Sequence, residues 1–143
     1  MAQHESFRVL LVDDDLALLE SMAAVLSDQF VVRSAFSGAQ ALSIMDGESF
    51  HVVCADWQMP GMSGLEFFEI VAGRNFALTP CFILVTGHTG ELLERVPYGD
   101  RTMLGTLRKP FSPNQLIERV SQFAGVAQLK RSSAALNEPL DER

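Results

Sequence analysis

The stretch Val9-Leu10-Leu11-Val12-Asp13-Asp14-Asp15 decides the fold class, because a short apolar run ends there in three carboxylates. A continuous run of Val and Leu is typical of a strand that is buried on both faces, as in a parallel sheet covered by helices. In such α/β proteins, ligands bind in the crevice outside the carboxyl ends of the strands. We therefore expect the three aspartates to lie at a ligand site.

Three further apolar runs end in a polar residue in the same way. These runs and the residues that follow them are Val52–Ala55 with Asp56, Phe82–Val85 with Thr86, and Met103–Leu107, through Arg108, with Lys109. In one parallel sheet the four strand ends share an edge, so carboxylates, a hydroxyl and an amine converge. That set of groups suits a divalent cation and a phosphoryl group.

Strand and helix signals alternate along the chain. The expected strands are Phe7–Val12, Phe30–Phe36, Val52–Ala55, Phe82–Val85 and Met103–Leu107. The expected helices are Leu16–Leu26, Ser37–Met45, Leu65–Ala72, a short one at Glu91–Val96 that Pro97 and Gly99 stop, and one that begins at Pro113. This alternation predicts an α/β fold, a three-layer sandwich with helices on both faces of a five-stranded parallel sheet joined by right-handed crossovers.

The last helix has a clear start and a gradual end. Ser112-Pro113-Asn114-Gln115 places Ser at the N-cap, Pro at the first helical position and Gln where a capping box needs it. From Gln128 onward the apolar periodicity fades, so we expect the helix to fray into a tail or linker. Residues 1–127 are thus predicted to form one domain and residues 128–143 a C-terminal tail or linker.

Composition narrows the class of protein. The chain has 143 residues, 48% of them hydrophobic and 20% charged, which is ordinary for one globular domain. A net charge of −7 argues against a nucleic-acid surface, since binding to a duplex needs clustered Lys and Arg. No apolar stretch approaches the roughly 20 residues that span a bilayer. The polar segment Met1–Phe7 does not read as a secretion signal, so we expect a cytoplasmic protein without membrane partners.

The two cysteines are expected to be reduced core residues. If the strand ends are level, Cys54 and Cys81 are offset by three residues, or roughly 10 Å, which exceeds the reach of a disulfide.

The acidic residues suggest a metal site. Two carboxylates at one strand end repel each other unless a cation lies between them, and Mg²⁺ prefers oxygen ligands. We interpret Asp13 and Asp14 in this way, and Asp15 as the N-cap of the following helix. Asp56 can ligate the same cation and can attack phosphorus to form an aspartyl phosphate. A lone Asp at a strand end is more often a turn residue, but the neighbouring acidic cluster favours the chemical role.

The remaining strand ends supply groups that can hold a phosphoryl group. Thr86 offers a hydroxyl and Gly87 leaves space beside it, although a structural Thr that caps the next segment is an alternative. Lys109 offers a point charge for phosphate or carboxylate. A cis bond between Lys109 and Pro110 would fit the tight turn there.

In order and spacing, these residues resemble the receiver domain of two-component response regulators, over roughly residues 6 to 127. The motifs that carry the resemblance are Leu11-Val12-Asp13-Asp14-Asp15, Asp56-Trp57-Gln58-Met59-Pro60-Gly61-Met62-Ser63-Gly64, Val85-Thr86-Gly87 and Lys109-Pro110-Phe111. Each motif alone is weak, but their combination is specific. The resemblance implies a doubly wound, flavodoxin-like fold with the strand order 2-1-3-4-5.

The resemblance implies a role for each site residue. Asp56 would accept a phosphoryl group from a histidine of a partner kinase or phosphotransfer protein, or from a small acyl-phosphate donor. Asp14 would ligate Mg²⁺ directly and Asp13 through water, with Asp56 and the Trp57 carbonyl completing the protein ligands. Thr86 and Lys109 would hold the transferred group. Such a protein is a bacterial regulator that slowly dephosphorylates itself, and is not a metabolic enzyme.

The resemblance also suggests partners and modulating residues. Gln58 and His88, each two residues beyond a site residue, would flank the phosphoryl group and tune its hydrolysis. Thr106 stands where the family often has Tyr or Phe as a switch residue. A downstream protein target or a C-terminal output domain is expected. Many members pair through the face of the fourth and fifth helices, so a homodimer is a further expectation.

Two alternatives remain open on the residues alone. Thr106 and the interrupted helix around Pro97 fit a receiver-like scaffold that no longer uses phosphorylation. Asp13-Asp14-Asp15 also contains the Asp-x-Asp of haloacid dehalogenase-like phosphatases, with Asp13 as the nucleophile and Asp15 as the acid/base. Against the phosphatase, Ala17 stands where that family has Thr or Val, no acidic pair follows a later strand, and Asp56 has no role.

Overall fold

One parallel sheet forms the centre of the molecule. The computed structural model describes residues 7–74, 80–87 and 104–136, with side chains up to residue 131. The strands are β1 (Arg8–Val12), β2 (Val31–Ala35), β3 (Val52–Asp56), β4 (Cys81–Thr86) and β5 (Leu104–Arg108). All neighbouring strands run parallel in the order β2-β1-β3-β4-β5, which confirms the predicted topology.

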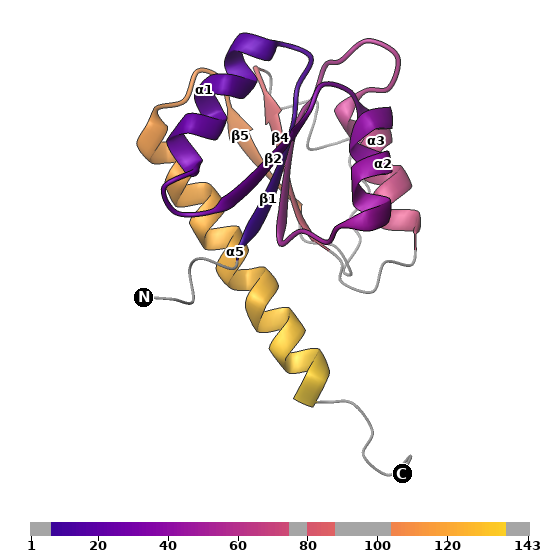
Figure 1. Cartoon of the computed structure of the whole chain (residues 1–143), viewed down its shortest axis with the longest axis vertical. Helices are drawn as coiled ribbons and strands as arrows, with labels where there is room; N and C mark the ends of the chain where they lie inside the picture. Colours follow the sequence, from indigo (N-terminus) through magenta and orange to yellow (C-terminus); the bar gives the residue numbers. More distant parts are fainter. Residues whose placement is uncertain (1–6, 75–79, 88–103, 137–143) are drawn as a thin grey trace.

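Helices cover both faces of the sheet and complete the predicted three layers (Figure 1). They are α1 (Leu16–Leu26), α2 (Gly38–Gly47), α3 (Gly64–Gly73) and α5 (Pro113–Leu136). In Figure 1, α1 and α5 lie on one side of the sheet, and α2 and α3 lie on the other. The short helix predicted at Glu91–Val96, before Pro97 and Gly99, falls outside the described residues.

Capping side chains fix where the helices begin. The Asp15 carboxylate accepts the Leu18 backbone N–H at 3.2 Å, so this residue caps α1 as predicted. At the start of α5, the Ser112 hydroxyl accepts the Gln115 N–H at 3.1 Å, and the Gln115 side chain accepts the Ser112 N–H at 2.8 Å. This is the predicted capping box, which satisfies two backbone donors at once.

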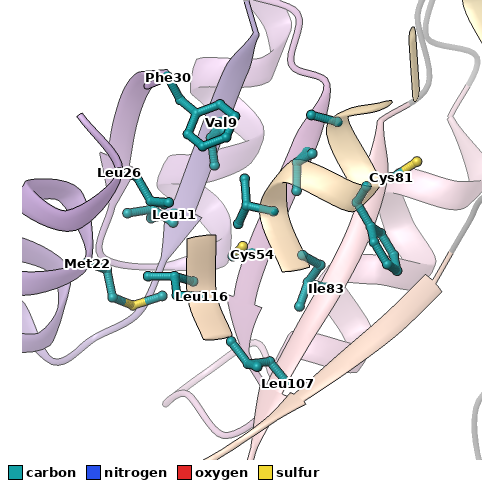
Figure 2. Close-up of a cluster of buried hydrophobic side chains, with 14 of the residues drawn as sticks. Val9, Leu11, Met22, Leu26, Phe30, Cys54, Cys81, Ile83, Leu107 and Leu116 are labelled. Atoms are coloured by element: carbon teal, nitrogen blue, oxygen red, sulfur yellow. The ribbon is translucent and has the colours of Figure 1, made fainter. Parts of the chain in front are cut away.

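Alternate residues of the central strands build two separate cores. Figure 2 shows the core beneath α1 and α5, to which the strands contribute Val9, Leu11, Cys54 and Ile83, and α5 contributes Leu116. The residues between them, including Leu10, Val53 and Phe82, face the core beneath α2 and α3. Every residue of β3 and β4 is buried, as expected of strands covered on both faces.

The two cysteines are free and buried, which confirms the predicted reduced core residues. Burial raises the pKa of the Cys54 thiol to about 12, so this sulfur stays protonated. The predicted three-residue offset is wrong, because Cys81 lies opposite Val52 and Cys54 lies opposite Ile83, an offset of two. The strand ends are not level, since Asp56 pairs with Val85 and β4 continues to Thr86.

Helix α5 does not fray at Gln128 but continues to Leu136. Interactions with the amino ends of the strands hold this part of α5, although its apolar periodicity has faded. The Arg131 guanidinium donates to the Phe50 carbonyl at 2.7 Å, and the Gln128 side chain hydrogen-bonds to His51. Burial and the charge of Arg131 lower the pKa of His51 to about 4, so its imidazole is neutral at physiological pH.

In the part of the chain that the structure describes, no helix is long and apolar enough to cross a membrane.

Candidate functional site

Polar side chains meet at the carboxyl edge of the sheet. Asp13 follows β1, Asp56 ends β3, Thr86 ends β4 and Lys109 follows β5. Backbone hydrogen bonds tie neighbouring strand ends together: Asp13 donates to Ala35 at 3.1 Å, and Lys109 donates to Thr86 at 2.8 Å. The register of the sheet thus places residues that are distant in sequence beside one another.

Three carboxylates form an acidic cluster at this edge. Asp13, Asp14 and Asp56 each offer an oxygen, and these oxygens lie within 4.8 Å of one another. Asp13 and Asp56 are buried, while Asp14 is exposed. Hard carboxylate oxygens at this spacing suit Mg²⁺ or Ca²⁺ and do not match the thiolate and imidazole sets that select zinc. The donor set of the cluster therefore fits the predicted cation.

Burial makes the Asp13 carboxylate costly to ionise. Removal from water raises the pKa of Asp13 above its ordinary value of 3.8. The Asp15 backbone N–H, which donates to Asp13 at 2.9 Å, works in the opposite direction, and the negative charge of Asp56 raises the pKa further. The charge of Lys109 lowers the pKa of Asp13, but the net pKa is raised, so without a bound metal ion ionised Asp13 destabilises the fold.

We expect an Asp13→Asn variant to melt a few degrees above the wild type in EDTA at neutral pH. Because the folded-state pKa of Asp13 is raised, the wild type loses stability as the pH rises from 3.8 through that pKa. The variant lacks this ionisation, and roughly 1 kcal/mol shifts the melting temperature of a domain this size by a few degrees. Thermal unfolding followed by circular dichroism measures the effect.

Two comparisons control the Asp13→Asn measurement. Asp28→Asn, which removes an exposed carboxylate away from the cluster, should leave the melting temperature within about a degree of the wild type. Added Mg²⁺ should stabilise the wild type more than Asp13→Asn, because the variant has lost one carboxylate. A variant that melts below the wild type in EDTA would contradict the repulsion inferred at Asp13.

Lys109 supplies a positive charge to the cluster. Its Nζ lies 3.0 Å from Asp56 Oδ1. Burial lowers the pKa of Lys109, but the hydrogen bond and charge of Asp56 outweigh this effect, so the net pKa is raised. The amine therefore remains a cation throughout the physiological range. The Lys109–Pro110 peptide bond is cis, as the sequence suggested.

Gly64 is a site residue that the sequence did not reveal. A Cβ at Gly64 would lie 2.3 Å from the Asp56 carbonyl oxygen, so only glycine lets α3 begin this close to the strand end. The Gly64 N–H donates to the Trp57 carbonyl at 2.9 Å. A carbonyl oxygen has two lone pairs, so the predicted metal-ligand role of Trp57 is compatible with this bond and stays a prediction.

Comparison with known proteins identifies the family. The model of the response regulator receiver domain family matches residues 9–121. This chain is a response regulator receiver domain. The match covers the acidic cluster, Thr86 and Lys109, and ends within α5.

Similar proteins include transcriptional regulators and a chemotaxis regulator. The chain is 28% identical to the probable transcriptional regulator ycf29 of Pyropia yezoensis, over 96% of the chain and 64% of the relative. It is 32% identical to the transcriptional regulatory protein CpxR homolog of Haemophilus influenzae, over 91% and 53%. The structure of the chemotaxis response regulator CheY4 of Vibrio cholerae matches with a TM-score of 0.73 and 26% identity, over 82% of this chain and 98% of that one.

The receiver domain therefore spans between about half and two thirds of the length of these two regulators. Its likeness to the chemotaxis regulator extends over nearly all of that chain.

The residues that were predicted to modulate the site, Gln58, Thr106 and His88, have different surroundings. Gln58 is exposed and lines a hollow of about 860 Å³ beside the start of α3. Thr106 is half-buried in β5, and its carbonyl accepts a hydrogen bond from Arg119. His88 lies outside the described residues. Thr86 is buried, and its role toward a phosphoryl group stays a prediction.

Proposed function

We propose that this receiver domain is a phosphorylation-controlled switch of a two-component system. Asp56 accepts a phosphoryl group from a histidine of a partner kinase or phosphotransfer protein, and the phosphorylated form binds a downstream protein or an attached output domain differently. The observation that carries this proposal is the 3.0 Å contact between Lys109 Nζ and Asp56 Oδ1 beside the acidic cluster. A cytoplasmic location belongs to the same proposal.

The proposed transfer needs little from the protein besides position and charge. A carboxylate oxygen of Asp56 attacks the phosphorus, and the phosphorus–nitrogen bond of the phosphohistidine breaks. The bonding electron pair leaves with the imidazole nitrogen of the donor. Lys109 and the Thr86 hydroxyl then hold the transferred oxygens, and the strand ends keep these groups at fixed separations.

A bound Mg²⁺ would neutralise negative charge on the phosphoryl oxygens and so lower the barrier to attack by a carboxylate. We propose that Asp14 and Asp56 would hold the cation directly and that Asp13 would hold it through water. The Trp57 carbonyl would be a further ligand. Binding of a metal ion is favoured here, because the negative charges of Asp56 and Asp14 repel that of Asp13 when no metal ion is bound.

Incubation of the full chain with acetyl phosphate and Mg²⁺ tests the proposal. We expect an intact-mass increase of one phosphoryl group, localised by peptide mapping to the segment that contains Asp56. The same incubation with EDTA should give no increase. An unchanged mass with Mg²⁺ at high donor concentration, from protein shown to be folded, would instead favour the scaffold that no longer uses phosphorylation.

We expect Lys109→Met to slow phosphorylation by acetyl phosphate by roughly 100-fold, the usual effect of removing one group that stabilises developing charge. Its affinity for Mg²⁺ should rise several-fold at the same time, because the cation that competes for Asp56 is gone. Mass spectrometry over time and a Mg²⁺ titration of Trp57 fluorescence measure the two effects.

Arg108→Met is a matched control for Lys109→Met, since it removes an exposed cation one residue away. Both properties should then remain close to those of the wild type. A parallel fall in rate and Mg²⁺ affinity in Lys109→Met would indicate a distorted site and would contradict the electrostatic role of Lys109.

The phosphatase alternative has less support. Asp15, which that mechanism needs as an acid/base, uses its carboxylate to cap α1. Asp13 and Asp56 share one cluster, and a phosphatase that uses Asp13 as its nucleophile leaves Asp56 without a function. We therefore propose the switch alone.

A further inference from the structure

A groove lies between α2 and α3. These two helices cover the face of the sheet opposite α1 and α5 (Figure 1). We call the groove the α2–α3 groove. It has a volume of about 740 Å³, and its walls are Ser37–Ala39 at the start of α2, Pro60–Met62 in the loop after β3, and Glu66, Glu69 and Ile70 of α3. This volume accommodates several side chains of a bound partner.

Two large apolar side chains line the α2–α3 groove and are open to solvent. Ile70 is 37% exposed, although it is a large aliphatic residue, and Met62 is half-buried. A Cβ at Gly38 would lie 2.6 Å from the Met62 sulfur, so the glycine lets this flexible side chain form the wall. Methionine side chains adjust to different apolar partners, which is why they recur at protein-binding surfaces.

The lining of the α2–α3 groove is negatively charged. Glu66 and Glu69 are exposed, lie one helical turn apart on α3, and also line the neighbouring hollow beside Trp57. The Glu66 carboxylate accepts the Ser63 N–H at 2.9 Å, which fixes its position. Among the described residues that line either hollow, none is Lys or Arg. The groove therefore offers glutamates that attract cations and apolar side chains that attract apolar groups.

We propose that the α2–α3 groove binds an amphipathic helix of a partner protein, with an apolar face flanked by Lys or Arg. A helix places apolar anchors three and four residues apart, which suits a groove formed by two helices and a loop. The negative charges of Glu66 and Glu69 would repel an anionic lipid surface. They also disfavour a second copy of this chain, which carries a net charge of −7.

A synthetic Leu/Lys amphipathic helix of about four turns is the probe, and the full ¹⁵N-labelled chain is the target. We expect saturable chemical-shift changes centred on Ala39, Met62 and Ile70. Glu69→Lys and Ile70→Ser should each weaken binding by roughly tenfold, through charge and apolar contact respectively. Glu20→Lys, which makes the same charge change on α1 across the sheet, should alter the affinity less than twofold.

Four outcomes would overturn the proposal. In the first, the chemical-shift changes are spread over the acidic surface, and Glu20→Lys and Glu69→Lys reduce them equally. A Leu/Glu helix that binds as tightly as the Leu/Lys helix is another. The third is a dimer in sedimentation velocity that Ile70→Ser abolishes, which would assign the groove to a second copy. The last is a complete lack of saturable binding. Since the probe carries no phosphoryl group and should bind Asp56→Asn unchanged, these results are independent of the proposed switch.

Discussion

Phosphoryl uptake from acetyl phosphate is expected to fall below detection in an Asp56→Asn variant. The amide nitrogen of Asn is a poor nucleophile because its lone pair is delocalised, while the amide oxygen can still accept a hydrogen bond from Lys109. The substitution therefore removes the reacting group and preserves the shape of the site, where Lys109 Nζ lies 3.0 Å from Asp56 Oδ1. Intact-mass spectrometry with excess donor and Mg²⁺ measures the labelled fraction.

Two variants sharpen the Asp56→Asn experiment. Asp28→Asn removes an exposed carboxylate elsewhere and should be labelled as fully as the wild type. If Asp56→Asn is still labelled and Asp13→Asn is not, the nucleophile is Asp13 and the phosphatase alternative is restored. A melting curve close to that of the wild type shows that loss of label is chemical and does not result from unfolding.

The second large effect is expected at Gly64, where alanine should lower the free energy of unfolding by about 3 kcal/mol. The added Cβ would lie 2.3 Å from the Asp56 carbonyl oxygen and 3.0 Å from the Trp57 Cα. Both are backbone atoms, so no flexible side chain can move aside, and α3 must shift away from the strand end. Chemical denaturation measures the loss.

Gly73→Ala is a matched control in the same helix. Nothing lies within 4 Å of a Cβ at Gly73, the last residue of α3, so alanine there should be neutral or stabilise by up to about 1 kcal/mol. Equal stability of Gly64→Ala and Gly73→Ala would contradict the close approach of α3 to Asp56. Because this shift of α3 also moves the Asp56 backbone, Gly64→Ala should be phosphorylated more slowly where it remains folded.

Sequence patterns were sufficient to predict the strands of the sheet and the three carboxylates of the acidic cluster. Continuous runs of Val, Leu and Ile can be recognised locally as buried strands, and the family resemblance implied the strand order. Once the order is known, Asp13, Asp56 and Lys109 must lie at one edge, and the structure places them there. The N-caps were equally visible, because a cap depends on residues three apart in sequence.

The features that the sequence did not reveal depend on contacts between distant residues. The end of α5 was predicted from fading apolar periodicity, but Gln128 and Arg131 hold the helix through polar contacts with His51 and Phe50. The offset of the cysteines depends on how far β4 extends past β3, which no local pattern encodes. Gly64 ended one of the sequence motifs without an assigned role, because its closeness to the Asp56 backbone exists only in three dimensions.

Helix α5 is continuous to Leu136, so the direction of its C-terminal end is set by the part of the helix that packs on the sheet. A fluorescent protein fused rigidly after Leu136 would have a defined orientation relative to the sheet, because Arg131 anchors the helix to Phe50. Inserting one residue between Arg131 and Leu136 would swing that cargo by about 100° around the helix axis and advance it by about 1.5 Å. The number of residues between Arg131 and a fused domain therefore sets the rotation of that domain about the helix axis as well as its distance from the sheet.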